Sequence, residues 1–206
     1  MIDAVVWDIG RVLIEYDPVR FFDSAIGPDR RKALFEAVDL ERYNLRSDAG
    51  ESLQEVMQEC AQEHPEFASE IRMFWDRWIE MASPEIPESV HLLKVLRARN
   101  IPVLALSNFG TETFRIACQH YPFLNSFDAR YVSGDMKMIK PDPAFYAALE
   151  KGSGYAPERL LFTDDKPENI AAAAARGWKT HLFESPHGWA ECLLSHGLIQ
   201  REDTQP

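Results

Sequence analysis

The chain has 206 residues, of which 46% are hydrophobic and 27% charged, a composition typical of a folded globular protein. Its formal net charge of −11 argues against nucleic acid as a partner, because binding to a phosphate backbone usually needs a basic face. No apolar run approaches the roughly 20 residues that a membrane-spanning helix requires, so no membrane partner is expected. The start lacks a signal-peptide pattern and the three cysteines are an odd number without C-x-x-C spacing, which together favour a cytoplasmic protein.

Short aliphatic runs alternate with helical patterns in most of the chain. From about residue 86 onward the alternation is regular, which is typical of a parallel sheet covered by helices on both faces. Five runs are predicted to be strands: Ala4–Trp7, Val103–Leu106, Ala129–Val132, Leu160–Thr163 and Thr180–Phe183. The intervening helices are predicted at Ser89–Arg99, Glu112–Gln119, Ala144–Lys151 and Glu168–Arg176.

Residues 17–85 interrupt this rhythm with helical periodicity and no convincing strand. Helices are predicted there at Pro18–Ala25, Arg30–Val38, Ser52–Gln62 and Phe67–Met81. We therefore expect an α/β fold, a Rossmann-like three-layer sandwich with a parallel five-stranded sheet and an inserted all-helical cap. The core would comprise residues 1–16 and 86–206, and the cap residues 17–85.

Polar side chains stand where the predicted strands end. In parallel α/β sheets the carboxyl ends of the strands form one edge, and ligands bind there. The residues at that edge are Asp8, the pair Ser107-Asn108, Lys140 shortly after the third strand, and the pair Asp164-Asp165. Three carboxylates at one edge repel each other unless a cation lies between them, and Mg²⁺ is a hard cation that takes oxygen ligands. A phosphate could then bind through the Ser107 hydroxyl and the Lys140 ammonium group.

Each of these residues also has an ordinary structural interpretation. The pair Asp164-Asp165 could cap the following helix, since carboxylates favour helix starts. Lys140 could be a solvated loop lysine, and Ser107 could bind a main-chain amide. Asp17, before Pro18, could cap a helix or take part in chemistry.

The order of these motifs resembles that of the haloacid-dehalogenase-like hydrolase superfamily. WDIGRVL is similar to its nucleophile motif, ALSN to its serine/threonine motif, KPDPAFY to its lysine motif and FTDDKPENI to its acidic motif. The resemblance covers essentially the whole chain. Within the superfamily the sequence is most similar to small sugar-phosphate phosphatases with a helical cap, which include an enzyme that hydrolyses α-glucose-1-phosphate.

The resemblance implies a phosphatase mechanism with an aspartyl-phosphate intermediate on Asp8. It implies that Mg²⁺ is held by Asp8, by the main-chain carbonyl of Gly10 and by Asp165, with Asp164 bound directly or through water. Substrate contacts are implied for Ser107, Asn108 and Lys140, and Asn169 is expected to orient the acidic loop.

Gly10 departs from the family pattern. Most phosphatases of the superfamily carry an aspartate at this position that protonates the leaving alkoxide, and general acid–base help is typically worth about 10²–10⁴-fold. Three interpretations remain open. The leaving group needs little assistance, a water or another residue replaces the aspartate, or the chain is a non-catalytic relative.

The function predicted from the sequence is a magnesium-dependent phosphatase for a small phosphorylated metabolite, most simply a sugar phosphate. Tyr43 and Arg46, in the predicted cap, are expected to contact the distal part of the substrate. A 2-haloacid dehalogenase is the alternative enzyme, although the acidic pair Asp164-Asp165 counts against it. The sequence leaves the oligomeric state and the physiological substrate open.

Overall fold

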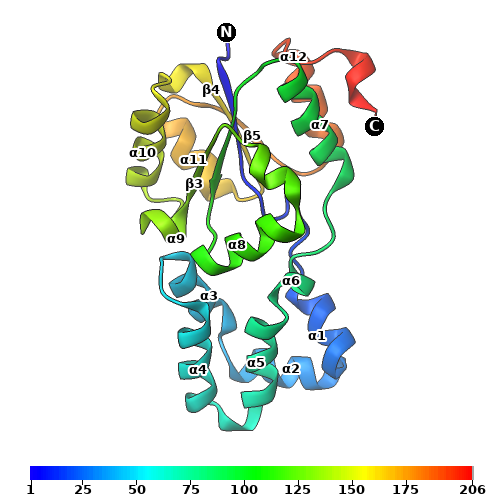
Figure 1. Ribbon diagram of the computed structural model, residues 1–206, viewed down its shortest axis with the longest axis vertical. Coiled ribbons are helices and arrows are strands. Elements are labelled where there is room, and N and C mark those ends of the chain that lie inside the picture. Colours follow the sequence, from blue (N-terminus) through cyan, green and yellow to red (C-terminus); the bar gives the residue numbers. More distant parts are fainter. Residues whose placement is uncertain (206) are drawn as a thin grey trace.

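The computed structural model describes residues 1–205 and shows a parallel five-stranded sheet with helices on both faces (Figure 1). The strands lie in the order β3-β2-β1-β4-β5. They are β1 (Ala4–Trp7), β2 (Val103–Ser107), β3 (Ala129–Val132), β4 (Leu160–Asp164) and β5 (Lys179–Leu182). The predicted α/β class is confirmed, and each strand begins and ends within one residue of its expected bounds.

The central strands are buried on both sides, which explains their continuous aliphatic sequences. Helices α10 and α11 pack on the face that carries Val6 and Phe162, and α7, α8 and α12 pack on the face that carries Val5 and Trp7. Trp7 meets Trp189 of α12 edge to face, with ring centroids 5.3 Å apart. The helices of this part of the chain are α7 (Pro87–Ala98), α8 (Thr111–His120), α9 (Ser133–Met136), α10 (Pro143–Ser153), α11 (Pro167–Ala175) and α12 (Pro186–Ser195).

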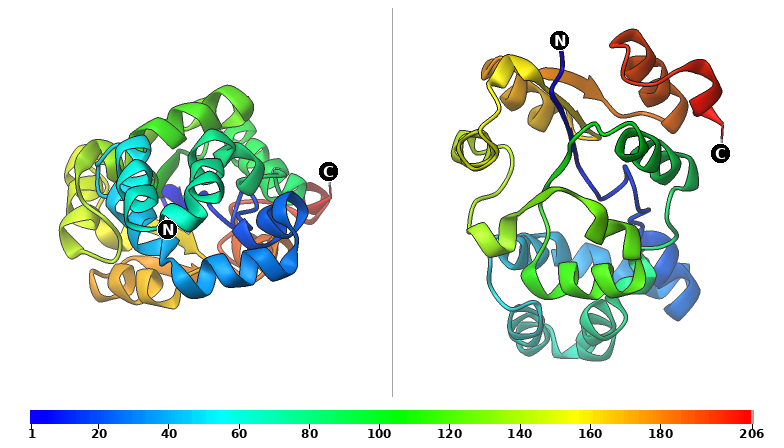
Figure 2. Two further views of the ribbon diagram at one scale, coloured as in Figure 1. Left: turned by 90° about the horizontal axis from the view of Figure 1, so that it is seen from below. Right: turned by 45° about the horizontal axis from the view of Figure 1, so that its top comes forward.

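The chain between β1 and β2 is helical, and in residues 8–102, all of which the structure describes, there is no strand. We call residues 17–85 the inserted segment. Its helices lie beyond the carboxyl ends of the strands and cover that edge of the sheet when it is viewed from their side (Figure 2). They are α1 (Pro18–Ile26), α2 (Pro28–Ala37), α3 (Leu40–Asp48), α4 (Leu53–Glu63), α5 (Ala68–Asp76) and α6 (Trp78–Met81).

The helical predictions need correction in two respects. The single helix expected over Phe67–Met81 is broken at Arg77, where the backbone leaves the helical region with φ of −123°. Helices α3, α9 and α12 were not predicted. The sequence of α3 is mostly polar, so its apolar periodicity is weak, and the helix packs mainly against α4 of the inserted segment.

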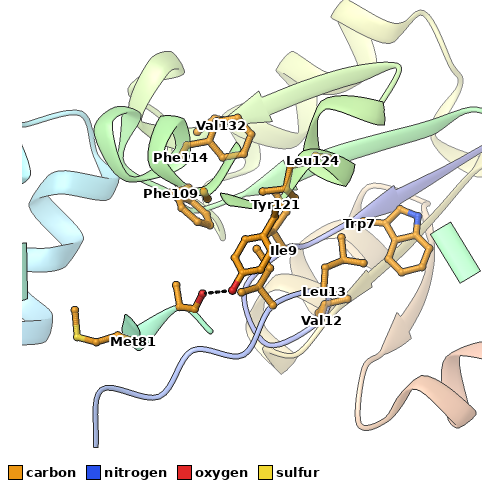
Figure 3. Close-up of a cluster of buried hydrophobic side chains, with 14 of the residues drawn as sticks. Trp7, Ile9, Val12, Leu13, Met81, Phe109, Phe114, Tyr121, Leu124 and Val132 are labelled. Carbon is orange, nitrogen blue, oxygen red and sulfur yellow. Dashed lines mark hydrogen bonds between the residues drawn. The ribbon is translucent and has the colours of Figure 1, made fainter. Parts of the chain in front are cut away.

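Two neighbouring stretches of chain connect the inserted segment to the sheet. In the stretch that leaves the sheet, the N–H of Glu15 donates to the carbonyl of Pro84, in the stretch that returns, at 2.8 Å. The returning stretch is also fixed to the core, because the Tyr121 hydroxyl donates to the carbonyl of Ala82 at 2.9 Å (Figure 3). These bonds fix the position of the inserted segment over the strand ends.

None of the helices in the described residues combines the length and the apolar character needed to cross a bilayer.

Candidate active site

The carboxyl ends of β1, β2 and β4 bring the predicted polar residues together. Trp7 of β1 pairs with Thr163 of β4, so Asp8 and Asp164 follow at neighbouring positions on the same edge. Ser107 is the last residue of β2. Lys140 reaches them from the loop between α9 and α10. We call Asp8, Ser107, Lys140, Asp164 and Asp165 the rim.

One carboxylate oxygen of Asp8 is held by three donors. Its Oδ1 accepts from the Ser107 hydroxyl at 2.6 Å, from the main-chain N–H of Ile9 at 2.8 Å, and lies 2.8 Å from Lys140 Nζ. Such charge-assisted bonds fix the orientation of the carboxylate. The other oxygen, Oδ2, accepts no hydrogen bond from the described residues, so it remains available for a cation or a substrate.

Lys140 is almost fully buried, at 3% exposure, and its ammonium group bridges two carboxylates. Nζ lies 2.8 Å from Asp8 Oδ1 and 2.6 Å from Asp164 Oδ2. Burial alone would lower the pKa of Lys140, but the charges of Asp8 and Asp164 outweigh that effect and raise it. The ammonium group therefore stays charged and neutralises part of the negative charge of the rim.

Asn108 holds the loop that carries Lys140. Its Nδ2 donates to the carbonyl of Lys140 at 3.0 Å, and its Oδ1 accepts from the N–H of Lys140 at 2.7 Å. The side chain of Asn108 is thus engaged with the main chain of Lys140, rather than directed at a phosphate as the sequence suggested. Its main-chain N–H is the group left for a substrate contact.

The two acidic residues after β4 differ in their surroundings. Asp164 is fully buried and accepts from Lys140, from the N–H of Lys166 at 2.8 Å and from Asn169 Nδ2 at 2.9 and 3.0 Å. Burial raises the pKa of Asp164, and the Lys140 ammonium group opposes that effect. Asp165 is partly buried and lies 3.9 Å from Arg11 Nη1. Asp164 therefore organises the rim, and Asp165 keeps its oxygens for another ligand.

The rim suits a divalent cation. Asp8, Asp164 and Asp165 each offer a carboxylate oxygen within 4.8 Å of the others, and Gly10 lines the same space. Burial and the neighbouring Asp8 raise the pKa of Asp165, as expected for carboxylates that lie close together. Neither acid is the N-cap of α11, which is Lys166 and makes no side-chain capping bond, although Asp164 accepts from the N–H of Lys166 just before the helix.

A cavity of about 640 Å³ lies between the rim and the inserted segment. From the core it is lined by Asp8, Gly10, Ser107, Asn108, Lys140 and Asp165. Its other wall comes from α1, α2, α3, α5 and α6 and the turns between them. A pocket at the carboxyl ends of parallel strands, with charged groups gathered at one side, is the usual position of an active site in such folds.

The sequence model of the haloacid dehalogenase-like hydrolase family matches residues 2–177. The chain belongs to this family. The chain is 31% identical over 110 residues to the sesquiterpene phosphatase of Aspergillus oryzae, a match over 52% of this chain and 54% of that protein. It is 28% identical over 109 residues to the enolase-phosphatase of Persephonella marina, over 52% of this chain and 47% of that protein. The matches thus span about half the length of these curated relatives.

The fold of the hydrolase is also similar to that of a family enzyme from Bacteroides thetaiotaomicron solved in complex with magnesium and inorganic phosphate. The TM-score is 0.76 at 23% identity, over 93% of this chain and 99% of that one. At this level of identity the likeness shows the shared fold.

The structure does not bring Tyr43 and Arg46 to the cavity. Tyr43 is buried, and its hydroxyl donates to Glu63 at 2.5 Å. Arg46 binds Glu51 and Glu59 at 2.6 and 2.8 Å. Neither is among the described residues that line the cavity. The prediction that they contact substrate is corrected, because their charged and polar groups face neighbouring helices and turns of the inserted segment.

Asp17 serves as a helix cap in the hydrolase. It is the N-cap of α1, and its side chain accepts from the N–H of Arg20 at 2.9 Å. The capping interpretation of Asp17 is therefore confirmed.

Arg11, Tyr16 and Asp48 are among the cavity residues that the sequence analysis did not assign. Arg11 lies within the nucleophile motif and Tyr16 shortly after it, and this proximity was a usable signal. Asp48 lies at the end of the unpredicted helix α3, so the sequence offered no reason to place it opposite Asp8.

Proposed function

We propose that this protein is a magnesium-dependent phosphatase that acts on a small phosphate monoester through a phosphorylated Asp8. The observation that carries the proposal is the fixed Asp8 carboxylate, with Ser107 and Lys140 on Oδ1 and Oδ2 left without a protein partner. A bond forms between an Asp8 oxygen and phosphorus as the ester P–O bond breaks. Water then attacks phosphorus, the bond to Asp8 breaks, and phosphate leaves.

The other rim residues bind and orient the phosphoryl group. The buried Lys140 offers its charge, and the Ser107 hydroxyl and the Asn108 main-chain N–H offer hydrogen bonds. Asp8, Asp165 and the Gly10 carbonyl are the groups that would hold Mg²⁺, with Asp164 behind them. When bound, the cation neutralises the carboxylates and the phosphoryl oxygens and so permits two anions to approach each other.

The two alternatives considered from the sequence fit the site less well. A 2-haloacid dehalogenase needs no metal, and the gathered carboxylates of Asp8, Asp164 and Asp165 would then repel each other without benefit. A non-catalytic relative would have no need of a nucleophile held by three donors. The relatives named as phosphatases support the same choice.

The wall of the cavity formed by the inserted segment would select the alcohol of the ester, as a cap. Polar side chains along it suit the sugar phosphate predicted from the sequence: Glu15, Glu36, Asp39, Glu41 and Asn44. Apolar side chains along the same wall support a second candidate, the phosphate of an apolar alcohol. Among them Val19 and Leu45 are 43% and 41% exposed, which is unusual for large hydrophobic residues of this protein.

The test is hydrolysis of para-nitrophenyl phosphate with and without Mg²⁺, followed by α-glucose-1-phosphate and a terpenyl phosphate. We expect turnover only with Mg²⁺, and Asp8→Asn should reduce it by at least about 10⁴-fold, because an amide is a poor nucleophile. Metal-independent turnover, or an Asp8→Asn variant with wild-type activity, would contradict the proposal. Preference for the sugar ester or the terpenyl ester decides between the two substrate classes.

A further inference from the structure

The site lacks a side chain at residue 10, next to the nucleophile, where a proton donor would be useful. A phosphate ester of an ordinary alcohol leaves as a basic alkoxide, so the departing oxygen gains from a proton in the transition state. Gly10 has no group to donate one. The rim offers no substitute, because Ser107 and Lys140 are directed at the Asp8 and Asp164 carboxylates and at the phosphoryl oxygens, and not at the departing alcohol oxygen.

Asp48 is a partly buried acid that the inserted segment contributes to the cavity wall. The wall contains four other acids from residues 11–47, namely Glu15, Glu36, Asp39 and Glu41, and each is exposed to solvent. Asp48 is partly buried. It lines the same cavity as Asp8 and ends helix α3.

The end of α3 is fixed against the core by close packing at glycines. A Cβ added to Gly110 would lie 2.5 Å from Ser47 Oγ, and a Cβ added to Gly50 would lie 2.8 Å from the carbonyl oxygen of Gly134. Side chains at these positions would force the two parts of the molecule apart. Gly110 follows Ser107-Asn108 in the chain, so the contact fixes Asp48 relative to the rim. Asn44 Nδ2 also lies 3.3 Å from Asp48 Oδ2 and orients the carboxyl group.

We propose that Asp48 is the proton donor to the leaving group, in place of a side chain at residue 10. The inference rests on the proposed phosphatase function. As the ester P–O bond breaks and the Asp8–phosphorus bond forms, the Asp48 proton moves to the alcohol oxygen. In the second step the Asp48 carboxylate takes a proton from the water that attacks phosphorus, and the starting state returns.

The surroundings of Asp48 bring its pKa close to neutral pH, so that it can both give and take a proton. Burial raises its pKa to about 7, opposed by the Gly110 N–H and by the charge of Lys166. Asp8 raises the pKa further, and Lys140 lowers it. Tyr16 lines the same cavity, and the pKa of its phenol is raised by burial and by the charge of Asp48. A proton donor with a pKa close to the working pH is well suited to general acid–base catalysis.

The experiment compares two esters with different leaving groups in wild type and Asp48→Asn. Para-nitrophenyl phosphate releases a stable anion, whereas n-butyl phosphate releases a basic alkoxide. Asp48→Asn should slow n-butyl phosphate hydrolysis by about 10²–10⁴-fold and para-nitrophenyl phosphate hydrolysis by less than about 10-fold. Retained para-nitrophenyl phosphate activity also shows that the variant is folded. Glu55→Gln, at an exposed acid of α4 that does not line the cavity, is the matched control and should affect neither ester.

The pH profile of the wild type is a second readout that needs no variant. The rate with n-butyl phosphate should fall as the pH rises through about 7, because Asp48 then loses its proton, while the rate with para-nitrophenyl phosphate should not fall in that range. Equal losses for both esters in a folded Asp48→Asn protein, or no loss for either, would overturn the inference. So would identical pH profiles. Wild-type protein without magnesium-dependent hydrolysis of either ester would overturn the proposed function, and the inference with it.

Discussion

The rim and the wall of the inserted segment face each other across one cavity, but they are built in different ways. At the rim each charged side chain binds another, so Lys140 contacts both Asp8 and Asp164, and Asn169 supports Asp164. Along the wall the acidic side chains are exposed to solvent, apart from Asp48, which is partly buried. The rim is thus an interdependent unit, whereas the wall consists of separable contacts. Substitutions on the two sides should therefore differ in size and in kind.

Lys140→Met should give the largest effect among the variants that leave the nucleophile in place. Removing one partner of a buried charged network typically costs about 3–5 kcal/mol, because the remaining charges are left uncompensated. We expect a loss of that size in urea unfolding, partly recovered by Mg²⁺, together with loss of phosphatase activity. Lys94→Met, at an exposed lysine, is the control. Unchanged stability would show that Asp8 and Asp164 do not depend on the ammonium group.

Asp165→Asn should have a smaller effect that depends on the metal concentration. Loss of a group that supports a metal ligand typically costs about 10–100-fold in metal affinity, and loss of a ligand should cost at least as much. The Mg²⁺ concentration for half-maximal activity should rise accordingly, and excess Mg²⁺ should recover part of the rate. A variant with wild-type Mg²⁺ dependence would remove Asp165 from the metal site.

Gly110→Ala tests a place where the inserted segment and the core are packed tightly against each other. The added methyl group meets Ser47 Oγ at 2.5 Å, and overpacking of this kind typically costs about 1–3 kcal/mol. The shift of α3 should lower activity on n-butyl phosphate more than on para-nitrophenyl phosphate, because it moves Asp48. Gly188→Ala is a suitable control, since its nearest neighbour, Ser185 Oγ, lies at an ordinary 3.5 Å. Equal rates for both esters would contradict a role for this contact in the chemistry.

Arg46→Gln should have the smallest effect. Arg46 binds Glu51 and Glu59 near the surface of the inserted segment, and such exposed ion pairs contribute little to stability. Both kcat and KM should stay within about twofold of wild type, because the side chain does not reach the cavity. A large rise in KM would instead support the prediction from the sequence that Arg46 contacts the substrate.

The residues of the rim could be predicted from the sequence because two signals locate the end of a parallel strand. A buried strand has a continuous aliphatic run, and the parallel arrangement places the residue after each run on one edge. Asp8, Ser107 and Asp164 follow such runs directly, so their neighbourhood was predictable without a structure. The engagement of Asn108 with the Lys140 main chain was not, since a sequence does not show which group a side-chain amide binds.

The residues of the wall were harder to predict, because a helical sequence says less about the side on which each residue lies. The polar sequence of α3 hid the helix itself, and with it the side on which each residue lies. Tyr43 and Arg46 were assigned to the cavity on residue type, whereas Asp48, from the same helix, lines it. A register of a few residues on a helix decides whether a side chain meets the substrate or a neighbouring helix.

The open space at Gly10 has a consequence for how this enzyme can evolve. A Cβ at this residue would meet nothing within 4 Å, so the backbone already accepts a larger side chain. In the genetic code aspartate is one base change from glycine. A single mutation could therefore add a carboxyl group beside the nucleophile without a compensating change in packing, while Asp48 continued to serve. Such a variant would have two proton donors. Asp48 would then be free to change, and the end of α3 could come to bind a different alcohol.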